Sequence, residues 1–269
     1  SFRYYDHSRA VKRRAYQIEY ARGANKTKLY KELLDYSKRI LSYLIESLQA
    51  PAPNAGIAYP ALVEQVSSLI GLTKKVISQT ERRVLNGEKV PHQEKILSIF
   101  EAHTNIIVKG ARDVQYGHKL NFTTGRSGLV LDVVIEQGNP ADLAQFCPMI
   151  ERQKDIYGRV PRQAAADGGY ASRENIKQAK ELGVKDVAFH KKCGILVEDM
   201  VKSNWVYNKL KRFRAGVEGN ISCLKRRYGL GRCLWKGLEK FKSYIWSSSV
   251  AYNLMQLARI LLAPKQSPG

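Results

Sequence analysis

The stretch from Glu198 to Tyr228 predicts one long amphipathic helix. Its apolar residues recur at spacings of three and four, which places them along one side of a helix: Val206, Leu210, Phe213, Val217, Ile221, Leu224 and Tyr228. We expect that side to lie in a core. At about 100° per residue, Arg214, Glu218 and Lys225 fall in a narrow band beside the apolar stripe.

This band of charge allows two interpretations. A carboxylate held between two cations at the rim of a core suits a site that binds a metal ion and a phosphate together. The other interpretation is an ordinary ion pair between Arg214 and Glu218, four residues apart on the helix surface. Such a pair stabilises a helix by about 0.3–0.5 kcal/mol.

The charge balance of the chain favours a polyanionic partner. Its 269 residues include 45 Lys and Arg against 24 Asp and Glu, a formal net charge of +21, and the cations are spread along the chain. Nucleic acid is therefore the leading partner, with a ribosome-like structural protein or an acidic membrane surface as the alternatives. The four cysteines form no CxxC pair, which favours reduced thiols over a zinc site. No apolar run approaches the ~20 residues of a membrane span, so we expect a cytoplasmic protein.

The first 90 residues predict a basic helical hairpin or small bundle. Residues 1–14 are rich in Arg and Lys, and residues 30–48 form an amphipathic pattern that the Pro and Gly of residues 51–56 interrupt. A second helix is expected from Tyr59 or Pro60 to Leu85, closed by Asn86 and Gly87.

After Pro91 the pattern changes to alternating strands and helices. Expected strands cover residues 106–108, 116–124, 128–137, 163–166 and 184–189, with a hairpin turn at 125–128. Expected helices cover residues 140–157, 173–182 with Ser172 as the N-cap, and 238–262 as a core-covering helix, before a tail at 264–269. This order predicts an α/β fold with a mixed sheet flanked by helices.

Asp167 is the second candidate site residue. It follows the short strand at 163–166 and precedes Gly168 and Gly169, and the carboxyl ends of strands are where ligands gather in open α/β sheets. Taken alone, an Asp here is most simply a turn former or helix cap. Together with Glu218, it supplies two carboxylates able to converge on Mg²⁺. Two such ions would support in-line phosphoryl transfer, with Arg214 and Lys225 neutralising the flanking phosphates.

The ordered motifs resemble a known family. Ala166-Asp167-Gly168-Gly169-Tyr170, followed by Arg214-xxx-Glu218-xxxxxx-Lys225, is similar to the catalytic half of bacterial insertion-sequence transposases of the DDE class. Segments 117–121 and 134–142 resemble the two strands and the Asn-x-x-Asp turn that precede the second Asp in that family. The resemblance covers roughly residues 95–262.

This resemblance implies an RNase H-like catalytic core at residues 91–263, with residues 1–90 as a helical insertion of the same fold. Asp167 and Glu218 would be the second and third catalytic acids and the ligands of Mg²⁺ or Mn²⁺. Double-stranded DNA, both transposon ends and target, would be the substrate, bound by a homo-oligomer associated with the bacterial nucleoid. The predicted DNA-binding residues are six cations: Arg214, Lys225, Lys211, Lys119, Arg226 and Arg227. Arg214 and Lys225 match the Arg and Lys of the family's Tyr-Arg-Glu-Lys signature, whereas Lys211 stands where the family has Tyr.

The first acid of the family has no counterpart in this sequence. In the family it lies on a strand that precedes the segment similar to residues 116–124, and no apolar strand bearing an Asp precedes residues 1–85. Asp132 lies on the wrong strand for this role, Asp113 precedes the second strand, and Asp6 is in a basic helical segment. We therefore expect an N-terminally truncated transposase that retains two of three metal carboxylates and does not catalyse strand transfer. A nucleic-acid-binding protein without catalysis, and a metal-dependent nuclease with another first carboxylate, are the alternatives.

Overall fold

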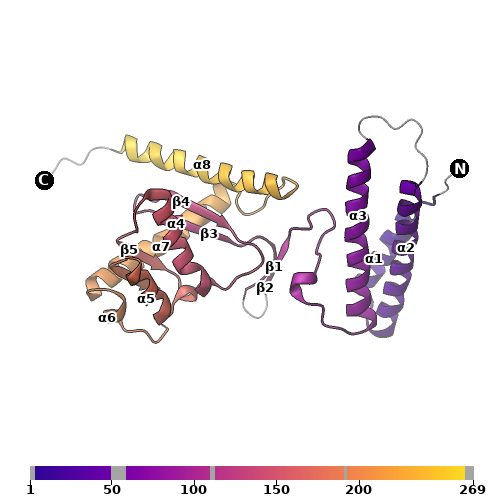
Figure 1. Ribbon diagram of the computed structural model, residues 1–269, viewed down its shortest axis with the longest axis horizontal. Helices are drawn as coiled ribbons and strands as arrows, with labels where there is room; N and C mark the ends of the chain where they lie inside the picture. Colours follow the sequence, from indigo (N-terminus) through magenta and orange to yellow (C-terminus); the bar gives the residue numbers. More distant parts are fainter. Residues whose placement is uncertain (1–3, 50–58, 110–112, 191–192, 264–269) are drawn as a thin grey trace. The chain divides into compact units, whose positions relative to one another are not determined.

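The computed structural model describes residues 4–49, 59–109, 113–190 and 193–263 (Figure 1). The chain divides into two compact units, Ser1–Ile106 and Ile107–Gly269. The predicted boundary near residue 90 falls inside the first of these units, and the predicted domain organisation stays a prediction. No helix in the described ranges combines the length and the apolar character that crossing a membrane requires.

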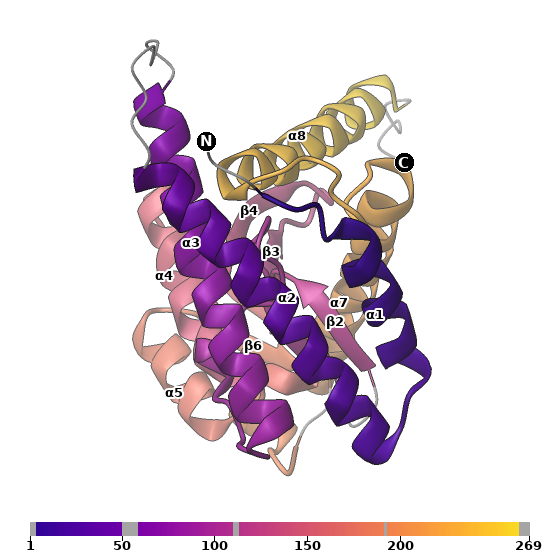
Figure 2. The same ribbon diagram turned by 90° about the vertical axis from the view of Figure 1, so that its right-hand side faces the viewer.

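The first unit is built from three helices, whereas the sequence predicted two amphipathic helices after a basic segment (Figure 2). They are α1 (Ser8–Tyr20), α2 (Gly23–Gln49) and α3 (Tyr59–Thr80), and α3 continues into a π-helical turn at Glu81–Leu85. The helices bury a small apolar core that consists of Ile18, Leu29, Leu34, Ile70 and Ile77. The predicted break at residues 51–56 lies outside the described residues.

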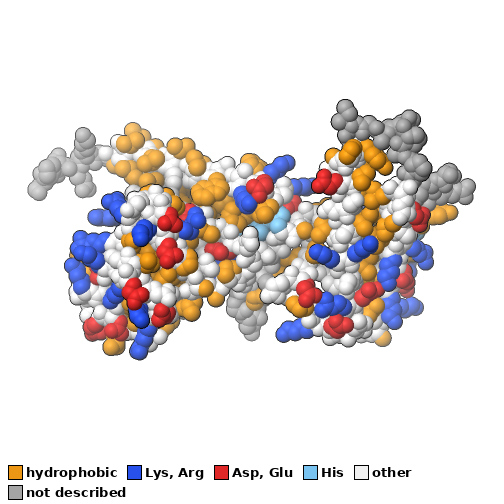
Figure 3. All heavy atoms as spheres, viewed as in Figure 1, with side chains coloured by type: hydrophobic (Ala, Val, Ile, Leu, Met, Phe, Trp, Pro, Cys, Tyr) orange, Lys and Arg blue, Asp and Glu red, His pale blue; other side chains and the backbone are white. Residues whose placement is uncertain are grey.

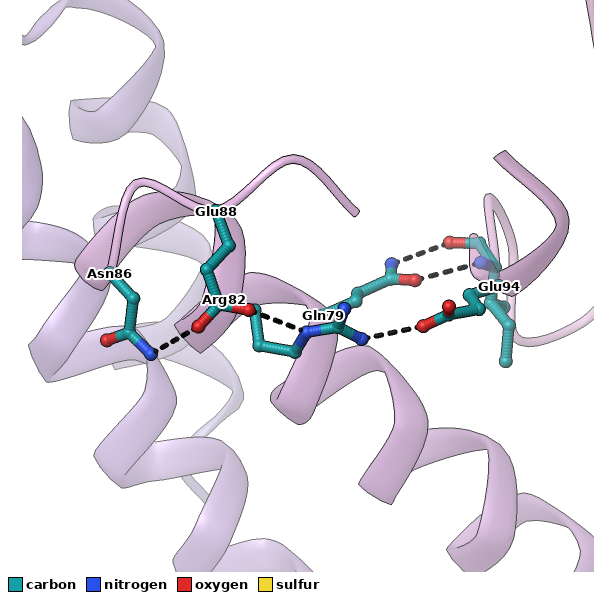
Figure 4. Close-up of polar contacts among 6 residues, drawn as sticks. Gln79, Arg82, Asn86, Glu88 and Glu94 are labelled. Atoms are coloured by element: carbon teal, nitrogen blue, oxygen red, sulfur yellow. Dashed lines mark hydrogen bonds and ion pairs between the residues drawn. The ribbon is translucent and has the colours of Figure 1, made fainter. Parts of the chain in front are cut away.

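A polar network ties the end of α3 to the segment that follows it (Figure 4). Arg82 lies between two carboxylates, with Nε 3.0 Å from Glu88 and Nη1 2.6 Å from Glu94. Asn86 donates to Glu88, and the Gln79 amide makes two hydrogen bonds to backbone groups of the next segment. The predicted end of the helix at Asn86 and Gly87 is confirmed, and Gly87 has a φ of +71°, a conformation that favours glycine.

The second unit contains strands and helices in the α/β order that the sequence predicts. The described strands pair as three two-stranded sheets: β1 (Asn105–Lys109) with β2 (Asp113–Gly117), β3 (Leu120–Thr124) antiparallel to β4 (Val130–Ile135), and β5 (Gln163–Ala166) parallel to β6 (Asp186–Phe189). Both pairing directions occur, but the described residues do not join into the one mixed sheet that was expected. The expected strand at 116–124 is wrong in its extent, because it is interrupted at residues 118 and 119 and divided between β2 and β3. The hairpin at 125–128 is confirmed by the bond from Gly128 N–H to the Gly125 carbonyl.

The main core of this unit surrounds β5 and β6. It is formed with α4 (Phe146–Tyr157), α5 (Arg173–Glu181), α6 (Val197–Met200) and α7 (Asn204–Arg227), and a 3-10 turn at Asp142–Gln145 precedes α4. The predicted cap of α5 is confirmed, since Ser172 Oγ accepts the Asn175 N–H at 2.9 Å. Asp186, at the start of β6, is buried and accepts hydrogen bonds from the Gln163 amide and the Lys202 N–H.

The long helix expected at 198–228 is interrupted. The short helix α6 ends at Met200, and α7 begins at Asn204 after Ser203, whose Oγ accepts the Val206 N–H. The predicted core side of α7 is confirmed in part, because Val206, Leu210 and Leu224 are buried whereas the other members of the stripe are partly exposed.

The last helix, α8 (Leu238–Leu262), has the predicted bounds, and its predicted apolar stripe is buried only in part. Its buried residues are Ile245, Ser248, Ser249 and Tyr252, and Tyr252 donates to the Gly128 carbonyl of the hairpin. Of the expected stripe, Ile245 is buried and Phe241 is partly buried, whereas Val250, Leu254, Leu257 and Leu261 are exposed. Trp246 is exposed beside them, and Figure 3 shows apolar side chains along α8. Small and polar side chains on the opposite face allow α8 to approach β4 closely.

Candidate active site

Asp167 directly follows β5, at the carboxyl end of this strand, which pairs in parallel with β6. Its carboxylate accepts the Gly168 N–H at 2.7 Å and caps the short 3-10 turn Gly168–Tyr170. About half of the side chain, 53%, remains exposed. Asp167 is therefore both the turn-capping Asp that the sequence allows and an accessible carboxylate at the carboxyl end of a strand.

Arg214 joins the two predicted acids. Its Nη2 lies 3.1 Å from Asp167 Oδ2, and its Nη1 forms an ion pair with Glu218 Oε1 on the next turn of α7. Because one planar guanidinium contacts both carboxylates, the two contacting oxygens lie within about 8 Å of each other. The structure thus brings together Asp167, Arg214 and Glu218, although Asp167 is far from the other two in sequence.

The two carboxylates differ from the arginine in their exposure. The Glu218 side chain is 66% exposed, whereas the Arg214 side chain is only 14% exposed. The guanidinium is packed, and the acids on either side of it face solvent. Oxygen ligands of this kind are those that Mg²⁺ and Mn²⁺ take from proteins, and metal ions in two-metal sites lie about 3.5–4 Å apart. The two carboxylates are donors of the kind that such ions take, and metal binding at this site stays a prediction.

A further carboxylate lies against the glycine turn. Asp142 forms an ion pair with Lys119, whose ammonium also donates to the Pro140 carbonyl at 2.6 Å. A Cβ on Gly169 would lie 2.7 Å from Asp142 Oδ2, so a larger residue here would displace the Asp142 side chain. The sequence pattern placed Asp142 in the Asn-x-x-Asp turn but not at the site; the glycine pair beside Asp167 was the only signal of such a close approach.

Tyr170 closes the buried side of the glycine turn. Its hydroxyl donates to Asn121 Oδ1 at 3.2 Å, and the Asn121 amide donates to Glu136 at 2.6 Å. Burial, with the nearby Asp142 carboxylate next in importance, raises the pKa of Tyr170 to about 12. The hydroxyl therefore stays protonated near neutral pH and holds β3 against the turn that carries Asp167.

The other predicted DNA-binding cations occupy different surroundings. Lys211 and Lys225 are exposed and share the Glu218 edge of α7, since they lie seven residues before and after it. Arg226 binds Ser222 of its own helix at 3.0 Å, and Arg227, nine residues after Glu218, lies on the opposite side of α7. Lys119 is engaged by Asp142. Their roles in DNA binding stay predictions.

The structure gives the surroundings of two of the three acids considered as a first catalytic residue. Asp132 is 2% exposed and receives two hydrogen bonds from Arg152, at 2.7 and 3.0 Å, so it has no room for a metal ion. Asp6 caps the start of α1 by accepting the Ser8 N–H at 2.8 Å, and the side chain of Asp113 lies outside the described residues. Among the described residues, no group of three or more His, Cys, Asp or Glu is arranged to hold a metal ion. The four cysteines are free thiols.

The site thus lies in an α/β domain and consists of two exposed carboxylates around an arginine, one at the end of a strand and one on a long helix. Residues 107–254 match the family described as the transposase DDE domain. This match covers more than half of the chain, and the chain belongs to that family. No curated protein and no solved structure matches the chain.

Proposed function

We propose that this protein is a DNA transposase of the insertion-sequence type, with Asp167 and Glu218 as its second and third catalytic acids. The observation that carries the proposal is the approach of both carboxylates to one guanidinium, within a region that matches the transposase DDE domain. An RNase H-like arrangement of the core belongs to the same proposal. The formal net charge of +21 supports double-stranded DNA as the partner and association with a bacterial nucleoid.

Members of the DDE family generally use divalent metals, and we propose that Mg²⁺ or Mn²⁺ binds between Asp167 and Glu218. When bound, such ions activate a water or 3′-hydroxyl and stabilise the leaving oxygen of an in-line displacement. Asp167 and Glu218 would supply the carboxylate oxygens that hold such ions. Arg214, released from the acids, donates to a phosphate oxygen, and Lys225 neutralises a phosphate next to it. Tyr170 keeps the turn that carries Asp167 in position.

We propose that the family's first acid is absent from these 269 residues. The observation behind this is that Asp132 is buried against Arg152, which removes it as a candidate. With two of three carboxylates, the chain is expected to bind metal and DNA but to give no strand transfer. Metal-dependent cleavage of transposon-end DNA by this chain would contradict the expectation.

We also propose that the protein acts as a homo-oligomer on DNA, with α8 at the interface between two copies. Five large apolar residues line one exposed face of α8, and the same stripe on a second copy is self-complementary about a two-fold axis. A Leu254→Glu, Leu257→Glu double variant is expected to be monomeric by light scattering where the unchanged protein is dimeric. An unchanged mass for the variant would exclude α8 from the interface.

The substitution Asp167→Asn tests the proposed site. Divalent-ion binding should fall, whereas DNA affinity without metal should hold or rise, because one negative charge is removed near the phosphates. Asp199→Asn, at an exposed Asp on α6 and with the same change in charge, is the matched control. If neither variant changes metal binding, the protein is a nucleic-acid-binding protein without this catalytic site.

A further inference from the structure

The outward face of α1 carries cations and aromatic rings together. At about 100° per residue, five exposed residues fall within an arc of about 100°: Arg9, Lys12, Arg13, Tyr16 and Tyr20. The buried residue of the helix, Ile18, lies on the opposite side. Glu19, the one acid of α1, falls just outside the arc, and Asp6, which precedes the helix, lies near Lys12. The three cations still outnumber these two acids.

The cations of this face are available to a partner. Arg9, Lys12 and Arg13 form no ion pair within the described part of the chain. Arg14, by contrast, is turned toward α2, where its Nε lies 2.5 Å from Glu32. The helix therefore uses one arginine for its own packing and leaves three cations at the surface.

The face is held in a fixed orientation. His7, just before α1, lies against two tyrosines of α2, with ring centroids 5.3 Å from Tyr36 and 6.0 Å from Tyr43. The burial of Ile18 fixes the other end of the helix against the core of the first unit (Figure 2). A binding surface fixed in this way loses little conformational freedom when a ligand binds.

The two tyrosines give the face a second kind of contact. Tyr16 and Tyr20 are 65% and 67% exposed, and their ring centroids lie 5.0 Å apart. Tyrosine hydroxyls donate hydrogen bonds to phosphate oxygens, as arginine and lysine do. The pair therefore adds neutral phosphate donors beside the three cations.

We propose that this α1 face binds the sugar-phosphate backbone of duplex DNA without reading its sequence. The inference rests on the proposed function, which makes duplex DNA the partner, and it assigns the contact to a surface far in sequence from Asp167 and Glu218. Arg9 to Arg13 span about 6 Å along the helix axis. A duplex carries one charge for every 1.7 Å or so of its axis, so several phosphates lie within reach of the three cations.

Fluorescence anisotropy of the full chain with a random-sequence duplex of about 20 bp, between about 50 and 200 mM NaCl, tests the proposal. The triple variant Arg9→Gln, Lys12→Gln, Arg13→Gln should lower the slope of log K against log salt by about 2.7, since each phosphate contact contributes about 0.9. Its affinity at about 100 mM salt should fall by at least about tenfold. Tyr16→Phe with Tyr20→Phe should cost a further few-fold through the lost hydroxyls.

The matched control is Lys28→Gln, Lys31→Gln, Lys74→Gln, which removes three exposed cations from other faces of the same unit. Its salt slope should change by less than about 1. An equal loss in both triple variants would overturn the proposal, and so would a loss that is larger for single-stranded RNA or for phosphatidylserine vesicles than for duplex DNA. Circular dichroism should show the same helix content in all variants, because the substituted side chains are exposed.

Metal titration separates this proposal from the function it rests on. The α1 triple variant should bind Mn²⁺ as the unchanged protein does, and Asp167→Asn should keep the full salt slope. A normal slope in the α1 variant with intact Mn²⁺ binding defeats only the α1 proposal. If the α1 triple variant loses the salt slope, but neither the unchanged protein nor any variant binds Mn²⁺, only the proposed active site is defeated.

Discussion

Replacing Arg214 by Gln should make the site bind divalent ions more tightly while it lowers stability without metal. In the metal-free protein the guanidinium neutralises Asp167 and Glu218 through two ion pairs. A metal ion that binds both carboxylates has to displace both contacts. A neutral glutamine side chain at this position would leave no ion pair to displace, so the energy of the two pairs would no longer oppose metal binding.

The magnitude follows from the exposure of the partners. Exposed ion pairs contribute about 0.2–1 kcal/mol each, and both carboxylates here are more than half exposed. Because solvent screens both ion pairs, their summed energy is about 0.5–1 kcal/mol. Removing this energy from the cost of metal binding should raise the metal affinity about two- to fivefold. The free energy of unfolding without metal should fall by a similar amount.

Mn²⁺ titration followed by electron paramagnetic resonance, at constant ionic strength, measures the change in affinity. Lys225→Gln is the control, because it removes the same charge from the same edge of α7 but breaks no ion pair among the described residues. Its effect should be smaller than that of Arg214→Gln. Equal effects, or weaker Mn²⁺ binding by Arg214→Gln, would refute the claim that Arg214 competes with metal for the two acids.

Three further predictions concern the scaffold. Arg152→Met should lower the free energy of unfolding in urea by about 3–5 kcal/mol, because it leaves the Asp132 carboxylate buried and unpaired; a loss below about 1 kcal/mol would show that water reaches this carboxylate. Burial alone would raise the pKa of Asp186, but a side-chain amide and a backbone N–H donated to it outweigh burial, and the pKa is lowered from its usual 3.8. The ionised Asp186 carboxylate therefore stabilises the fold above pH 3.8, and this stabilisation is lost as the pH falls through the lowered pKa. Asp186→Asn should make the free energy of unfolding fall less steeply at acid pH. An unchanged fall at acid pH would contradict this. Gly169→Ala should destabilise the protein by about 1–3 kcal/mol, since the new methyl group meets Asp142 Oδ2 at 2.7 Å; a thermal melt that matches the unchanged protein would show that the acid moves aside freely.

Local chemistry in the sequence predicted most of the secondary structure. Ser172 caps α5, Asn86 and Gly87 end the π-helical turn, and residues 125–128 turn the β3–β4 hairpin, as expected. Short patterns also defined the places of Asp167 at the end of a strand and of Glu218 on the edge of a helix. The structure shows both acids in contact with Arg214, and their catalytic roles stay predictions.

The failures have different causes. The helical spacing begins at Val206 and does not show that Ser203 caps a new helix and separates it from α6. The alternation at 116–124 hides the break between β2 and β3. For α8, spacing identified an apolar stripe but not that only Ile245 and Phe241 of it pack on the core. Its buried face carries Ser248, Ser249 and Tyr252, which hydrophobicity alone does not select.

The location of a bound Mn²⁺ ion tests the central claim most directly. In crystals soaked with Mn²⁺, anomalous scattering should place the metal in direct coordination with one carboxylate oxygen of Asp167 and one of Glu218, with Arg214 withdrawn from both. Manganese bound elsewhere, while Arg214 still contacts the two acids at saturating metal, would contradict the account.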